Sequence, residues 1–100
     1  MPTPAECQSL SQLREELDRL DEQVLRLLGE RARYVEAAAR FKTSETAVAA
    51  PERMAGMLAR RRHWAEREGL DPDVIEDMYR RLVAYFIERE LNEWRRRSAT

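Results

Sequence analysis

Apolar residues recur at alternating intervals of three and four along residues 10–42, which places them on one stripe of a single α-helix. The stripe consists of Leu10, Leu13, Leu17, Leu20, Val24, Leu27, Tyr34, Ala38 and Phe41. Arg31 occupies a position where this register calls for an apolar side chain. Because the spacing continues in phase across Gly29, the pattern predicts one helix from Leu10 to Phe41 or Lys42.

A helix of that length measures about 50 Å at roughly 1.5 Å per residue. A compact domain of this size has a radius of gyration of only about 13 Å, so the rest of the chain is too short to enclose the helix. Either the helix bends back at Gly29, which costs about 1 kcal/mol, or its stripe is buried against a second copy. The in-phase spacing and the absence of turn residues around Gly29 favour a second copy.

The segments on either side of this helix carry no helical stripe. Residues 1–9 are expected to form a loose arm, in which Ser9 or Ser11 caps the long helix. Residues 43–50 are small or polar, which indicates a mobile loop.

Two further helices are predicted from their end signals. Pro51 suits the first position of a second helix, and Gly69 suits its end. Asp71 and Pro72 then start a third helix, which runs to about Arg96. The sequence therefore predicts an all-α fold, with residues 1–100 forming a single domain of three helices.

Composition narrows the classes of protein. A hydrophobic content of 43% gives a core that is thin for a monomer and sufficient for a dimer. The net charge of −1 and the pI of about 5.9 predict no general attraction to nucleic acid or to an anionic membrane. Cys7 is the single cysteine, and neither a signal peptide nor a membrane span is recognisable, so a cytoplasmic protein is expected.

Lys42 stands out because the other 17 of the 18 basic residues are arginine. An ammonium is a compact point charge, whereas a guanidinium is a planar fork. Lys42 has therefore either been retained for chemistry or survived by chance, and the sequence leaves both explanations open.

Arg31 and Glu90 are charged residues on predicted apolar faces, Arg31 on the first helix and Glu90 on the third. A buried charge is costly unless it is paired. Arg31 is either a partner for an acid such as Glu90 or part of an anion-binding site. Glu90 is either a structural partner for an arginine or, with its pKa raised by burial, a protonated acid that donates a hydrogen bond.

Arg14 and Arg53 are further candidates for binding an anion. Arg14 lies about 25 Å from Arg31 along the helix, so the two can share a small ligand only if they come from different copies in an antiparallel dimer. Arg53 opens the second helix, where a bound anion would offset its repulsion by the helix dipole. Taken alone, a solvated arginine is the simpler explanation for Arg53.

Several segments resemble the all-helical chorismate mutase family, and the resemblance extends from Leu10 to Trp94. They are Leu13-Arg14, Leu17-Asp18-Arg19-Leu20-Asp21, Gly29-Glu30-Arg31, Arg40-Phe41-Lys42 and Pro51-Glu52-Arg53 with Met57-Leu58. Other segments are most similar to the isochorismate-pyruvate lyases of that family, which act in salicylate and siderophore synthesis. These are Phe41-Lys42-x-Ser44-Glu45, Ala50-Pro51-Glu52-Arg53 and Trp64-Ala65-Glu66 before Gly69-Leu70-Asp71.

The resemblance implies an intertwined homodimer with two active sites, each built from both chains, and neither a cofactor nor a metal. Arg14 of the partner chain and Arg31 would bind the carboxylates of a small dianionic substrate. Lys42, on the mobile loop, would bridge a carboxylate and the ether oxygen, and Glu90 would face that oxygen. Arg53 would help to close the site.

Two departures from the family bear on the substrate. Typical mutases carry acids that engage the ring hydroxyl of chorismate where this chain has Ala50 and Met54, which favours the lyase. The lyases carry Gln where this chain has Glu90, and only a protonated Glu can donate a hydrogen bond to the ether oxygen.

Three functions follow as hypotheses. The first is cofactor-free, pericyclic cleavage of isochorismate to salicylate and pyruvate, with weak chorismate mutase activity. The second is a chorismate mutase that makes prephenate. The third is a non-catalytic helical dimerisation module.

Overall fold

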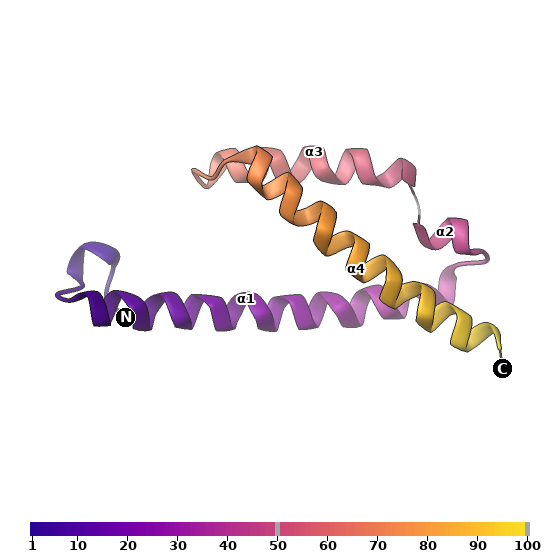
Figure 1. Ribbon diagram of the computed structural model, residues 1–100, viewed down its shortest axis with the longest axis horizontal. Helices are drawn as coiled ribbons and strands as arrows, with labels where there is room; N and C mark the ends of the chain where they lie inside the picture. Colours follow the sequence, from indigo (N-terminus) through magenta and orange to yellow (C-terminus); the bar gives the residue numbers. More distant parts are fainter. Residues whose placement is uncertain (50, 100) are drawn as a thin grey trace. The chain divides into compact units, whose positions relative to one another are not determined.

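A computed structural model describes residues 1–49 and 51–99 of the chain (Figure 1). The elements in these ranges are the 3-10 helices η1 (Pro4–Glu6) and η2 (Ala39–Phe41) and the α-helices α1 (Leu10–Ala38), α2 (Glu45–Ala49), α3 (Pro51–Arg67) and α4 (Pro72–Ser98). The prediction of an all-helical chain with three main helices and a long first helix is confirmed. None of the helices in these ranges combines the length and the apolar content that crossing a membrane requires.

The chain divides into two compact units, Met1–Arg33 and Tyr34–Thr100, with the boundary inside α1. In the first unit, Ser9 Oγ accepts a hydrogen bond from the Gln12 backbone N–H at 3.0 Å. The Gln12 side chain in turn accepts the backbone N–H of Gln8 at 2.7 Å. The bond to Ser9 satisfies an N–H group in the first turn of α1, and it confirms Ser9 as the cap of this helix.

The apolar stripe of the first unit lies at the surface of the chain. Leu10, Leu13, Leu17, Leu20, Val24 and Leu27 are between 37% and 64% exposed. Exposed apolar patches of this kind mark interaction sites in soluble proteins.

The second unit is organised around the hairpin of α3 and α4, which lie side by side and are joined by a tight turn (Figure 1). Met57, Leu58 and Val83 form its buried core. Gly69 ends α3 with a φ of +75°, a conformation that suits glycine. The Leu70 N–H reaches back to the Ala65 carbonyl at 2.8 Å, as in a Schellman motif.

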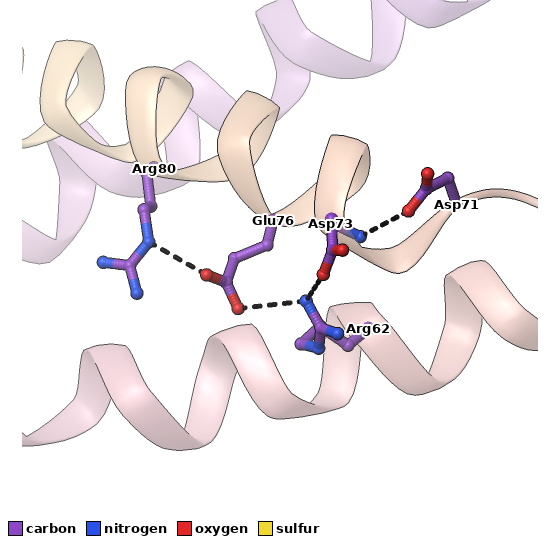
Figure 2. Close-up of polar contacts among 5 residues, drawn as sticks. All are labelled: Arg62, Asp71, Asp73, Glu76 and Arg80. Atoms are coloured by element: carbon purple, nitrogen blue, oxygen red, sulfur yellow. Dashed lines mark hydrogen bonds and ion pairs between the residues drawn. The ribbon is translucent and has the colours of Figure 1, made fainter.

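Ion pairs on the surface join α3 to the first turns of α4 (Figure 2). Arg62 donates to Asp73 at 2.8 Å and to Glu76 at 3.4 Å, and Arg80 donates to Glu76 at 3.2 Å. The Asp71 side chain caps α4 by accepting the Asp73 backbone N–H at 2.9 Å. The start signal that the sequence predicted at Asp71 and Pro72 is therefore confirmed.

The prediction of a loop over residues 43–50 needs correction, because Glu45–Ala49 forms the short helix α2. Ser44 Oγ accepts the Ala47 backbone N–H at 3.1 Å, close to the start of this helix. Glu45 is held by Arg95 of α4 at 2.7 Å. The mobility of this segment remains a prediction, as does that of residues 1–9, and Ala50 lies outside the described residues.

Candidate active site

Lys42 lies where the backbone leaves the helical run after α1. Its N–H bonds the Ala39 carbonyl at 3.2 Å and closes η2, and its backbone is extended, with φ −95° and ψ 141°. The Lys42 ammonium then turns to two acceptors. It donates to the Ala47 carbonyl of α2 at 3.2 Å and lies 3.7 Å from Glu90 Oε1 of α4.

Glu90 is buried, with 6% of its surface exposed. It shares the inner face of α4 with Val83 and Phe86 because the three are separated by intervals of three and four residues. Burial raises the pKa of the Glu90 carboxyl, whereas the charges of Lys42 and Arg53 act in the opposite direction. In the described part of the chain, Oε1 of Glu90 accepts no hydrogen bond. When Glu90 is protonated, an O–H at this atom would be available to donate a hydrogen bond to a ligand.

The structure brings Lys42, Glu90 and Arg53 together within the second unit. Arg53 is exposed in the first turn of α3, yet its charge is near enough to oppose the rise in the pKa of Glu90. Arg14 and Arg31 belong to the first unit, where Arg14 is exposed and Arg31 is half-buried. Their separation of about 25 Å along α1 keeps them from one small ligand within a single chain.

Sequence reasoning missed the contacts that hold Lys42 from outside its own segment. The Trp94 indole N–H donates to the Lys42 carbonyl at 3.0 Å, although 52 residues separate the two in the sequence. The Ala47 carbonyl on the Lys42 ammonium was also not predicted. One signal was available: Trp94 follows Glu90 by four residues, so the two lie on one face of α4.

A polar depression elsewhere in the second unit is separate from these residues. It is lined by Glu36, Arg89, Asn92 and Glu93. Arg89 already binds Glu36 through Nε at 2.9 Å and the Tyr85 hydroxyl through Nη1 at 2.9 Å. The depression is open and its arginine is paired, so we assign the chemistry to Lys42 and Glu90 instead.

Comparison with known proteins identifies the family of this arrangement. Residues 13–91 match the model of the family "chorismate mutase type II". The chain belongs to this family. The family resemblance that the sequence predicted is therefore confirmed.

Individual relatives differ in how much of their length they share with this chain. It is 43% identical over 95 residues to the isochorismate pyruvate lyase of Pseudomonas aeruginosa, which covers 95% of this chain and 94% of that protein. It is also 40% identical over 75 residues to the T-protein of Enterobacter agglomerans and 36% identical over 77 residues to that of Haemophilus influenzae. These two matches cover 74% and 76% of this chain but only 20% of each T-protein.

Proposed function

We propose that the protein is an isochorismate-pyruvate lyase, which cleaves isochorismate to salicylate and pyruvate. The observation that carries this proposal is the 43% identity to a lyase of that name over nearly the full length of both chains. The ammonium of Lys42 beside the buried carboxyl of Glu90 supplies the chemistry that such a reaction needs.

The proposed reaction is a rearrangement within one molecule. The C–O bond of the enolpyruvyl ether breaks while a ring hydrogen moves to the methylene carbon of the side chain. The ring becomes aromatic as salicylate, and the side chain leaves as pyruvate, so every atom of the substrate appears in the two products. The protein has to hold the compact conformer and stabilise the charge that develops on the ether oxygen.

Each site residue has a proposed role in that task. Lys42 places its positive charge on the ether oxygen and a carboxylate, and protonated Glu90 donates a hydrogen bond to the same oxygen. Arg31, together with Arg14 of a second copy, binds the substrate carboxylates as bidentate partners. Arg53 adds positive charge at the mouth of the site.

The second copy is part of the proposal. The exposed leucines of α1 supply an apolar surface that a partner helix would bury. An antiparallel partner would bring its Arg14 toward Arg31, which one chain cannot do alone. We therefore propose an intertwined homodimer with two shared active sites.

A chorismate mutase that makes prephenate is the second candidate. It is favoured by the matched family model and by Glu90, since some mutases carry Glu where the lyases carry Gln. A weak mutase activity beside the lyase activity is also consistent with these residues.

The product distinguishes these functions. Purified protein is incubated separately with isochorismate and chorismate, and salicylate is followed by fluorescence and prephenate by chromatography. The lyase proposal requires salicylate and pyruvate in equal amounts from isochorismate, at a higher kcat/KM than prephenate from chorismate. The reverse order would make the protein a mutase. Turnover of neither substrate, with no rise in melting temperature on adding either, would leave a helical dimerisation module.

A further inference from the structure

Trp94 holds the backbone of Lys42 from the same helix face that carries Glu90. Its indole N–H donates to the Lys42 carbonyl at 3.0 Å, while Glu90, one turn earlier, lies 3.7 Å from the Lys42 ammonium. The backbone carbonyl and the side-chain ammonium of Lys42 therefore both contact one rigid element, α4. This arrangement fixes where the ammonium lies relative to Glu90.

A second restraint on Lys42 comes from α2 and is less direct. Its ammonium also donates to the Ala47 carbonyl of α2, and α2 is tied to α4 through Glu45 and Arg95 at 2.7 Å. That ion pair is exposed on both sides, and exposed pairs contribute little. The half-buried indole of Trp94 is the stronger restraint, because a hydrogen bond sheltered from water competes less with solvent.

We propose that Trp94 is a positioning residue for the reaction: its indole N–H fixes the Lys42 carbonyl and thereby aims the Lys42 ammonium at the reacting oxygen. The lysine stem has four rotatable bonds, so its charged end is placed well only if the backbone that carries it is fixed. A displacement of about 1 Å in a catalytic group can cost roughly 100-fold in rate. The statement about rate rests on the proposed lyase function, whereas the statement about the position of Lys42 does not.

Kinetics of Trp94→Phe test the role in the reaction, because phenylalanine keeps an aromatic ring but lacks the N–H, together with the second ring of the indole. We expect kcat to fall about tenfold, with KM changed by less than about twofold, since the carboxylate-binding arginines are untouched. Trp64→Phe is the matched control, because it alters the other tryptophan, whose ring lies against Arg61 on α3. This control should retain the activity of the wild type.

A double-substitution cycle separates positioning from a purely structural role. If Trp94 acts through Lys42, Trp94→Phe should lower the residual rate of Lys42→Ala by less than about twofold. If Trp94 only stabilises the fold, its effect should be the same in both backgrounds. An additive result, or a kcat of Trp94→Phe within twofold of wild type, would overturn the proposal.

A measurement without substrate uses the fact that Lys42 is the single lysine of the chain. Protein labelled with ¹³C,¹⁵N-lysine gives one lysine amide signal and one lysine Cε signal. Trp94→Phe should shift the amide and broaden the Cε signal, whereas Trp64→Phe should leave both unchanged. Unchanged lysine signals in Trp94→Phe would refute the positional restraint, even if the wild type cleaves isochorismate. If Trp94→Phe shifts the lysine signals but the wild type has no lyase activity, only the proposed function would be refuted.

The wild type provides a check should Trp94→Phe fail to fold. Both indole N–H protons are followed by exchange with solvent. Trp94 should exchange at least about tenfold more slowly than Trp64, because its N–H is hydrogen-bonded and half-buried. Equal exchange rates would show that the hydrogen bond from Trp94 to Lys42, on which the proposal depends, does not form.

Discussion

The hairpin of α3 and α4 and the N-terminal part of α1 carry the same kind of apolar stripe but differ in what covers it. In the hairpin, Met57, Leu58 and Val83 are only 3% to 8% exposed, because the chain packs these residues against each other. On α1, Leu17 is 58% exposed and Leu27 is 64% exposed. A helical stripe thus predicts that a face will be buried, without stating by what.

The two regions also divide the candidate site. Lys42 and Glu90 lie in the unit that has its own core, and their contact at 3.7 Å is made within one chain. Arg14 and Arg31 lie on the α1 segment whose leucines are exposed. Substitutions in the two regions should therefore lower activity in different ways. Those near Lys42 should slow the chemical step, and those on the leucine stripe of α1 should weaken dimer assembly.

The largest effect is expected on the exposed stripe, from Leu17→Glu. Burying a leucine is worth about 1.5–3 kcal/mol, and a symmetric dimer loses it twice, so association should weaken by at least about 3 kcal/mol. That corresponds to a rise of at least about 100-fold in the Kd of the dimer. Sedimentation velocity would report the monomer, and activity would fall with the dimer population.

Arg26→Glu is the matched control for assembly, since it introduces the same side chain at an exposed position of α1 that is ion-paired with Glu22. It should remain dimeric. A monomeric wild type, or a dimeric Leu17→Glu variant, would contradict the homodimer.

The next largest effect is expected at Lys42, in the self-packed region. Lys42→Ala should lower kcat by at least about 100-fold, or about 2.7 kcal/mol, on the scale of a lost oxyanion donor. Sedimentation velocity should show an unchanged dimer. Arg81→Ala, which removes an exposed cation of α4, is the control and should keep wild-type activity. A Lys42→Ala rate within tenfold of wild type would count against the proposed role.

A smaller effect is expected in the pH dependence governed by Glu90. Burial raises its pKa, and the proposed donor is the protonated acid, so kcat should fall as the pH rises through that raised pKa. Glu90→Gln donates at every pH, so its profile should be flat between about pH 5 and about pH 9. At the alkaline end of this range, where the wild type has lost the proton of Glu90, Glu90→Gln should exceed the wild type in kcat.

Glu88→Gln provides the comparison for the pH profile, because Glu88 is an exposed carboxylate on the same helix. Its profile should follow that of the wild type. If the wild type is flat and Glu90→Gln is indistinguishable from it, the protonated acid has no part in the reaction.

The smallest effect concerns the cap of α4. Asp71→Ala removes the acceptor for the Asp73 backbone N–H and should lower the free energy of unfolding by about 1 kcal/mol. Urea denaturation would measure it, with Asp77→Ala on an exposed part of α4 as control. Equal losses in the two variants would show that the cap contributes nothing specific.

Much of this fold was predictable because its signals are local. Ser9, Gly69 and Asp71 mark helix ends through hydrogen bonds within a few residues of themselves. The inward direction of Glu90 followed from the helical period, and its burial confirms it. The roles of the site residues and the homodimer remain proposals.

The sequence-based predictions failed where contacts between residues far apart in the sequence decide the structure. Helix α2 is too short to display a stripe, and one of its ties is the ion pair between Glu45 and Arg95. The hydrogen bond from Trp94 to Lys42 could not be read from spacing either, because it joins positions 52 residues apart.

By itself, the sequence determined the three main helices, most of their ends and the residues that face inward, since these depend on neighbours within one or two turns. It did not predict α2, nor that α1 ends at Ala38 and continues as the 3-10 helix η2. Only the tertiary structure decided which side chains Lys42 meets. That depends on how α4 packs beside η2 and α2, and packing between distant segments leaves no periodic trace in the chain.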